Sequence, residues 1–219
     1  MIRNTTYGEV YCSRHGILLP LYSSSEKARM GFASDILDIG YDIFLNYLAA
    51  HSKAFFFTLN LHYPETMPFY PLDNSDMERF IAALIQNLAW KNYDPAYLWV
   101  RERDNSEHHH YHVALWLNGN EIQHPQRVID EVIALWGQCV GKEFFTAGLV
   151  HYEGAYRYAL MLRRQPGLLL EFQTGFRTFS YLAKQYSKEI QLPVRCRRYG
   201  YSQLKTERHS NELMNILLS

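Results

Sequence analysis

Two strand-like segments joined by a short polar connection limit the folds open to this chain more than any other feature. The segments AYLWVRER (residues 96–103) and HYHVALWLNG (residues 110–119) are rich in the aromatic and β-branched residues that strands prefer. Polar residues 104–107 connect them, and the second segment ends in an Asn-Gly turn. This arrangement predicts an antiparallel hairpin.

Strand and helix patterns alternate along the rest of the chain. Residues 1–22 lack a regular pattern, residues 154–167 are ambiguous, and Gly40 is expected to bend or divide the first helix. The other predicted strands are residues 54–63, 147–153 and 194–203, and the predicted helices are residues 23–53, 76–91, 125–140 and 171–190. This order predicts an α+β fold, with an antiparallel five-stranded sheet flanked by helices.

The expected domain organisation follows from the same patterns. A helical extension is predicted over residues 1–47, a main domain over residues 48–208 and a tail over residues 209–219. No apolar run approaches the roughly 20 residues that span a bilayer, and no signal peptide is evident. The three cysteines are far apart and form no Cys-x-x-Cys pair. These features predict a soluble protein of a reducing, cytoplasmic compartment, without a membrane partner.

Positive charge is concentrated in one part of the chain, although 22 Lys and Arg balance 22 Asp and Glu overall. Residues 157–208 carry 11 Lys and Arg against three Glu, which indicates either an anion-binding region or a solvated basic face. Tyrosines at positions 199 and 201 interleave with the basic residues and could stack on bases. The candidate DNA-binding residues are Lys188, Arg195, Arg197, Arg198, Tyr199 and Lys205.

Four histidines crowd the start of the second hairpin strand. Side chains two apart on a strand share a face, so His110 and His112 project together while Tyr111 points to the other side. Glu102 lies near the end of the preceding strand, so a hairpin could bring its carboxylate alongside them. Two imidazoles and a carboxylate predict a divalent metal site. A polar strand edge, with Glu102 paired to a neighbouring arginine, is the alternative interpretation.

The segment SYLAKQYSK supplies a candidate nucleophile. On a helix, Tyr181, Lys184 and Lys188 fall within about 80° of one another, whereas Tyr186 lies roughly 140° from Tyr181. A phenol, with a pKa of about 10, attacks a phosphodiester slowly unless the phosphate is polarised and the developing charge is neutralised. A metal ion at the histidine pair could polarise the phosphate, and Lys184 could stabilise the charge. The two constellations together therefore predict phosphodiester cleavage.

Three segments resemble the ordered motifs of HUH endonucleases, the rolling-circle replication initiators and relaxases. They are FFFTLNLHY (residues 55–63), HYHVALWLNG (residues 110–119) and YLAK (residues 181–184). The chain between about residues 50 and 205 is similar in particular to the inovirus, or filamentous phage, replication-protein family, which also occurs in prophages. The resemblance implies a palm of antiparallel strands, HUH/RRM-like, in a bacterial host.

The resemblance also implies roles for particular residues. His110 and His112 would bind Mg²⁺ or Mn²⁺, with Glu102 as the third ligand. Tyr181 would become joined to the 5′ phosphate of a nicked strand and leave a free 3′ hydroxyl, with Lys184 as its helper. The implied partner is single-stranded or hairpin origin DNA.

The sequence alone leaves the role of the first motif, the choice of nucleophile and two other functions open. The first motif, around Thr58 and Asn60, would contribute support and DNA contacts, and Tyr186 is the alternative nucleophile if the helix phase differs. The chain contains no P-loop motif, so unwinding would require a host helicase. A catalytically inactive, prophage-derived nucleic-acid-binding module is the second hypothesis. A structural histidine strand in an unrelated α+β protein is the third.

Overall fold

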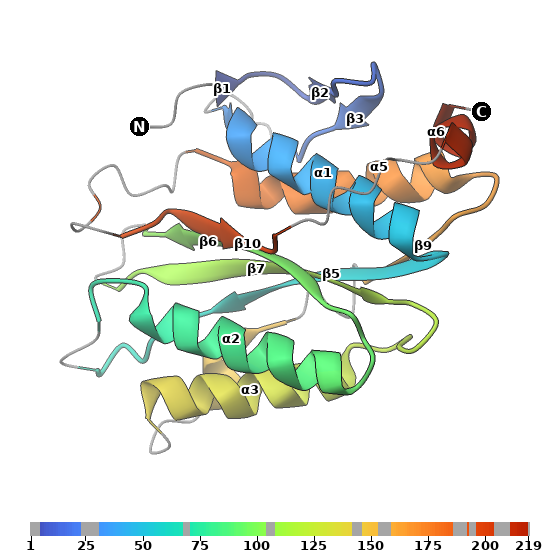
Figure 1. The fold of residues 1–219 in the computed structure, drawn as a ribbon. Coiled ribbons are helices and arrows are strands. Elements are labelled where there is room, and N and C mark those ends of the chain that lie inside the picture. Colours follow the sequence, from blue (N-terminus) through green and yellow to red (C-terminus); the bar gives the residue numbers. More distant parts are fainter. Residues whose placement is uncertain are drawn as a thin grey trace.

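A central antiparallel sheet lies between two helical layers in the computed structural model of this chain (Figure 1). The structure describes residues 5–22, 31–67, 71–103, 108–141, 146–152, 159–185, 192, 196–203 and 211–218. The strands are β1 (Thr5–Thr6), β2 (Val10–Cys12), β3 (Leu18–Pro20), β4 (Phe32–Ala33), β5 (Lys53–Leu61), β6 (Ala96–Glu102), β7 (His110–Asn118), β8 (Val150–His151), β9 (Leu160–Arg163) and β10 (Tyr199–Tyr201). The helices are α1 (Ser34–Ala50), α2 (Ser75–Trp90), α3 (Gln126–Val140), η2 (Thr146–Leu149), α5 (Leu168–Ser180), η3 (Tyr181–Ala183) and α6 (Asn211–Leu218).

The main sheet confirms the predicted α+β class and its antiparallel pairing. Its strand order is β10-β6-β7-β5-β8, and β9 also pairs with β5. The sequence predicts five strands, whereas the described residues form six, because β8 and β9 share one edge of β5. β9 forms within the segment that carries no clear sequence pattern. The predicted hairpin forms as β6 and β7, and β7 pairs with β5 on its other side.

The two faces of β7 pack against different helices, as the strand period of two requires. Tyr111, Val113, Leu115 and Leu117 are buried in the hydrophobic cluster that includes α2 and α3. Ala114 and Trp116 belong instead to the cluster formed with α1 and α5. The prediction that the Tyr111 face packs on helices is therefore confirmed. The same alternation directs residues 110 and 112 toward the side of the sheet that α1 and α5 cover.

The N-terminal part of the chain differs from the sequence prediction. Residues 1–22 are predicted to be irregular, yet β2 and β3 pair as a hairpin whose Tyr11 and Leu19 are buried against the α1 and α5 cluster. The first helix is predicted from residue 23, but Phe32–Ala33 form β4, which pairs with β1, and α1 begins at Ser34. These strands are too short to show a period in the sequence.

α1 is an integral part of the core of the described chain. Its residues Ile36, Leu37, Tyr41, Phe44 and Leu48 are buried with side chains of the sheet and of α5. The predicted boundary at residue 47 falls inside this helix. α1 also runs through Gly40 without a break, so the predicted division of the helix is wrong. Among the described residues, no helix combines the length and apolar character needed to cross a bilayer.

Gly40 allows α1 to approach α5 closely. A Cβ atom at this position would lie 2.0 Å from the ring of Phe179. Gly40→Ala is therefore expected to lower the free energy of unfolding by about 1–3 kcal/mol, although alanine favours helices by about 1 kcal/mol. Chemical denaturation measures this difference. The control is Gly175→Ala, whose Cβ would meet its nearest neighbour at 3.2 Å and should cost less. A Gly40→Ala protein that is more stable than wild type would contradict this packing.

Candidate metal centre

The β6–β7 hairpin brings a carboxylate and two imidazoles together on one face of the sheet. Glu102 is directly opposite His110, and His112 follows two residues later on the same face. The Glu102 Oε2 atom lies 3.1 Å from His112 Nε2 and 4.0 Å from His110 Nε2. The three potential ligand atoms all lie within 4.8 Å of one another, and all three residues are buried. This group could hold a metal ion.

The hydrogen bonding of His112 fits a cation between these residues. Asn60 pairs with His112 across β5 and β7, and its Oδ1 atom accepts a hydrogen bond from His112 Nδ1. A neutral imidazole that donates through Nδ1 keeps a lone pair on Nε2. In that tautomer the lone pair would face the Glu102 carboxylate, 3.1 Å away. Two electron-pair donors that face each other in a buried site are stabilised by a positive charge between them, as in metal centres whose histidines are oriented by a second hydrogen bond.

Tyr181 and Lys184 reach this centre from the end of α5. The Tyr181 ring lies edge-on to His112, with ring centroids 5.5 Å apart. Lys184 Nζ lies 3.4 Å from Glu102 Oε2 and 3.6 Å from the centroid of the Tyr181 ring. Lys184 is only 6% exposed. A phenol, an ammonium group and the three potential ligands therefore share one site.

The backbone that carries Tyr181 and Lys184 is not the predicted helix. α5 ends at Ser180, Tyr181–Ala183 form a 3₁₀ turn, and Lys184 has an extended ψ of 140°. The helical phase argument for these two residues is therefore wrong. The chain leaves the helix because it is held by the segment before α1: Lys184 forms an isolated bridge with Phe32, and the Gln185 amide donates to the Gly31 carbonyl at 3.1 Å.

The charges of the site favour an anionic ligand once a cation is present. Glu102 and Lys184 are both buried and form an ion pair, so their charges offset each other. A divalent cation would add two positive charges that no second carboxylate of the described centre balances. Because unbalanced buried charge is costly, an anion such as a phosphodiester would then be stabilised here.

One protein family model matches the part of the chain that contains this whole site. Residues 23–202 match the family model for the YagK/YfjJ C-terminal domain. The chain belongs to the YagK/YfjJ C-terminal domain family. Neither a search of curated proteins nor a search of solved structures returned a match. The matched region of the YagK/YfjJ domain contains the candidate metal ligands, Tyr181 and Lys184, whereas β1–β3 and α6 lie outside it.

Two residues beside the YagK/YfjJ-domain site were not singled out from the sequence. His62 stacks on His110, with ring centroids 4.9 Å apart and an angle of 7° between the rings, and it also contacts His151. The sequence signal for His62 is its spacing of two from Asn60, because a residue directly after β5 can continue the alternation of that strand. Tyr22 packs edge-on against Tyr181 at 5.0 Å, and its amide donates to Ser180 Oγ. No sequence pattern links Tyr22 to that residue.

His109, by contrast, lies away from the centre. Its Nε2 atom is 3.0 Å from the Tyr111 hydroxyl on the α2 and α3 side of the sheet. Burial lowers the pKa of His109 to about 3, and the positive charge of Arg101 acts in the same direction. His109 is therefore a neutral core residue at ordinary pH.

The structure describes three of the predicted DNA-binding residues: Arg197, Arg198 and Tyr199. Tyr199 lies in β10, which is shorter than the predicted strand over residues 194–203, and Arg197 and Arg198 precede it. Arg197 forms an ion pair with Glu78 at 2.7 Å.

Thr58 lies in β5, as expected for the first motif. Four predicted residues lie outside the described part of the chain: Tyr186, Lys188, Arg195 and Lys205.

Lys184→Met is expected to tighten Mn²⁺ binding by about tenfold, because a cation beside Glu102 meets the repulsion of the Lys184 ammonium group. Titration followed by electron paramagnetic resonance, without DNA, measures this affinity. Lys91→Met is the control, since Lys91 pairs with Glu131 between α2 and α3. Unchanged or weaker Mn²⁺ binding in Lys184→Met would show that the ammonium group does not oppose a cation.

Proposed function

We propose that this chain is a metal-dependent, tyrosine-based endonuclease that nicks and rejoins single-stranded DNA, and so initiates rolling-circle replication of a phage, prophage or plasmid-like element. The resemblance to HUH endonucleases supports this proposal. The observation that carries it is the meeting of Tyr181 and Lys184 with the Glu102, His110 and His112 group in one buried site.

The proposed reaction is a transesterification at phosphorus. The Tyr181 hydroxyl releases its proton to solvent as its oxygen bonds to phosphorus, the bond from phosphorus to the 3′ oxygen breaks, and the leaving oxygen takes up a proton from solvent as a free 3′ hydroxyl. Lys184 stabilises the phenolate and the charge that develops on the phosphate. Glu102, His110 and His112 would hold a divalent cation, which would supply a Lewis acid for the scissile phosphate. Attack of a 3′ hydroxyl on the phosphotyrosine reverses these steps and rejoins the strand.

The proposed cofactor is Mg²⁺ or Mn²⁺. Carboxylate oxygens suit both ions, whereas two imidazole ligands favour Mn²⁺ over Mg²⁺. His110 and His112 would each contribute Nε2, and Glu102 would contribute a carboxylate oxygen.

The proposed partners follow from the reaction. The substrate would be single-stranded or hairpin origin DNA, and a host helicase would unwind the duplex after nicking. The proposed setting is the cytoplasm of a bacterial host, where the free thiols of Cys12, Cys139 and Cys196 would stay reduced.

Covalent capture tests the proposal. The protein is incubated with Mn²⁺ and a labelled pool of single-stranded oligonucleotides that includes hairpins, and the products are separated under denaturing conditions. We expect a covalent protein–DNA band that is absent when a chelator is added. DNA binding without a band, with the whole hairpin pool and either metal, would favour the catalytically inactive nucleic-acid-binding module instead.

A further inference from the structure

We propose that a groove beside β10 binds an unpaired base of the DNA strand, near the phosphodiester that Tyr181 attacks. This subsite rests on the proposed function. The groove has a volume of about 590 Å³, within the usual range for ligand pockets. One wall comes from Asp35 and Ile36 of α1, and the other from β10 with Arg197 and Arg198 before it.

Two tyrosines form an aromatic surface in this groove. Tyr199 and Tyr201 are two residues apart on β10, and their ring centroids lie 6.3 Å from each other with 30° between the rings. Tyr201 is 43% exposed, so a base can reach its ring. The Tyr199 hydroxyl donates a hydrogen bond to Asp35 at 3.0 Å, which fixes its ring against α1. Adjacent rings on a strand are the kind of platform on which single-stranded bases stack.

The strand register places this surface near the metal centre. Tyr199 is opposite Val100 on β6, and Val100 is opposite His112 on β7. Neighbouring strands are about 4.8 Å apart, so Tyr199 is roughly 10 Å from the backbone of His112. Tyr199 also packs on the hydrophobic cluster of α1 and α5, the same side of the sheet as the histidine pair. A single strand that passes the metal centre can therefore place a nearby base in the groove.

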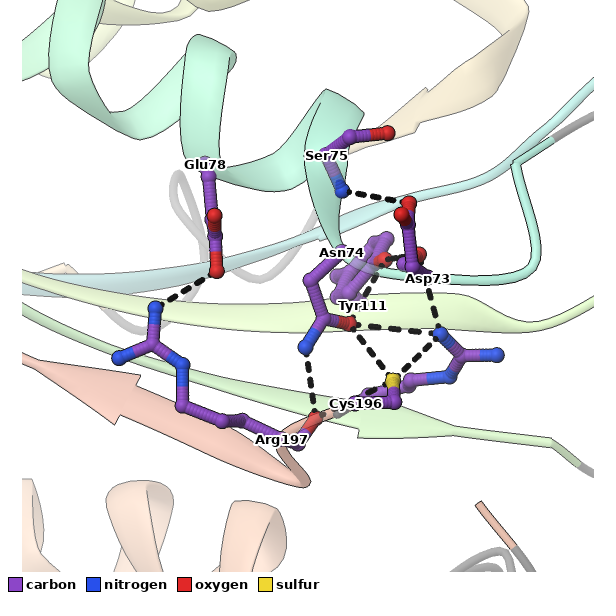
Figure 2. A network of polar contacts seen from close by, with 8 residues as sticks. Asp73, Asn74, Ser75, Glu78, Tyr111, Cys196 and Arg197 are labelled. Atoms are coloured by element: carbon purple, nitrogen blue, oxygen red, sulfur yellow. Dashed lines mark hydrogen bonds and ion pairs between the residues drawn. The ribbon is translucent and has the colours of Figure 1, made fainter. Parts of the chain in front are cut away.

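A polar network on the opposite side of the sheet holds the segment that leads into β10. Figure 2 shows Asn74 at the start of α2 between Tyr111, Cys196 and Arg197. The Asn74 side chain donates to the Arg197 carbonyl at 2.9 Å, and the buried Arg101 guanidinium lies 3.0 Å from Cys196 Sγ. These contacts fix the backbone before β10, so the groove is formed before any ligand arrives and less ordering entropy is lost on binding.

The charges around the groove favour a base inside it and phosphates at its rim. Asp35 lines the interior, and its carboxylate would repel a phosphate. Arg198 lines the strand side, where it can attract the DNA backbone, whereas the Arg197 guanidinium is held by its ion pair with Glu78. Burial, together with the hydrogen bond to Asp35, raises the pKa of Tyr199 to about 12, so this ring stays neutral.

Binding without metal tests this subsite independently of catalysis. The probe is a fluorescein-labelled, mixed-sequence single-stranded oligonucleotide, and its anisotropy is measured in the presence of a chelator. We expect Tyr201→Ala to weaken binding by about tenfold or more, and Tyr201→Phe to stay within about twofold of wild type. The control is Tyr7→Ala, because Tyr7 is 68% exposed and lies outside the groove. Thermal unfolding of each variant confirms that its fold is retained.

Two outcomes would overturn the subsite. One is a Tyr201→Ala protein that binds the probe as wild type does, and the other is an equal loss in Tyr7→Ala. The anisotropy measurement detects binding and involves no covalent step. Absence of a covalent band in the capture assay would therefore reject the proposed nickase, while the binding result would still test the subsite. Conversely, a band that forms in Tyr201→Ala with unchanged DNA affinity would reject the subsite and keep the nickase.

Discussion

Tyr181→Phe is expected to abolish the covalent protein–DNA band, with a loss of rate on the order of 10⁴-fold or more. The substitution removes only the hydroxyl that would attack phosphorus and keeps the ring that packs against His112 and beneath the Lys184 ammonium group. Affinity for single-stranded DNA should therefore stay close to that of wild type. Band formation with Mn²⁺ and anisotropy with the same oligonucleotide measure the two effects.

The matched control for this variant is Tyr22→Phe. Tyr22 contacts the Tyr181 ring, so its substitution tests whether any phenol beside the site is sufficient. We expect Tyr22→Phe to keep the band because its ring contact is unchanged. A band that persists in Tyr181→Phe and is lost in either Tyr22→Phe or Tyr186→Phe would assign the nucleophile to that other tyrosine.

Glu102→Gln is expected to remove the stabilisation that a divalent cation gives to the protein. At 100 times its dissociation constant, a ligand of the folded state adds about 2.7 kcal/mol of stability. For a chain of this size that amounts to a rise in Tm of roughly 5–10 °C. Glutamine is nearly the same size as glutamate but lacks the charge that the cation and Lys184 share at this buried position. Thermal unfolding with and without Mn²⁺ measures the shift.

The control for the metal experiment is His124→Ala, because His124 is exposed and is not part of the metal centre. Its Mn²⁺-dependent shift should equal that of wild type. Each variant is compared with its own metal-free form, since loss of the Glu102 charge also leaves the buried Lys184 ammonium group without its counter-ion. If Mn²⁺ raises the Tm of Glu102→Gln as much as that of wild type, the ion binds at a different site.

The grouping of Glu102, His110 and His112 was predictable because it depends on the most regular part of the fold. Strand side chains alternate with a period of two, so the spacing of His110 and His112 fixes their common face. The short connection of the hairpin then sets Glu102 opposite His110, with no long-range information needed. The opposite face, from Tyr111 to Leu117, could be assigned to the helices by the same rule.

The geometry of the tyrosine segment was not predictable from its sequence. The amphipathic pattern of the predicted helix over residues 171–190 continues past Ser180, but pairing of Lys184 with Phe32 draws the chain into an extended conformation. Phe32 lies about 150 residues earlier in the sequence, so the local helix propensity of the segment cannot reveal this pairing. The contact between Tyr22 and Tyr181 could not be predicted either, because these two residues are also far apart in the sequence.

The measurement that tests the account most directly is identification of the residue joined to DNA. The covalent complex is digested with protease and nuclease, and the modified peptide is sequenced by mass spectrometry. We expect a phosphodiester-linked nucleotide on Tyr181, found only when Mn²⁺ or Mg²⁺ was present. A nucleotide attached to a residue remote from Glu102, His110 and His112, or attached equally well in chelator, would contradict the account.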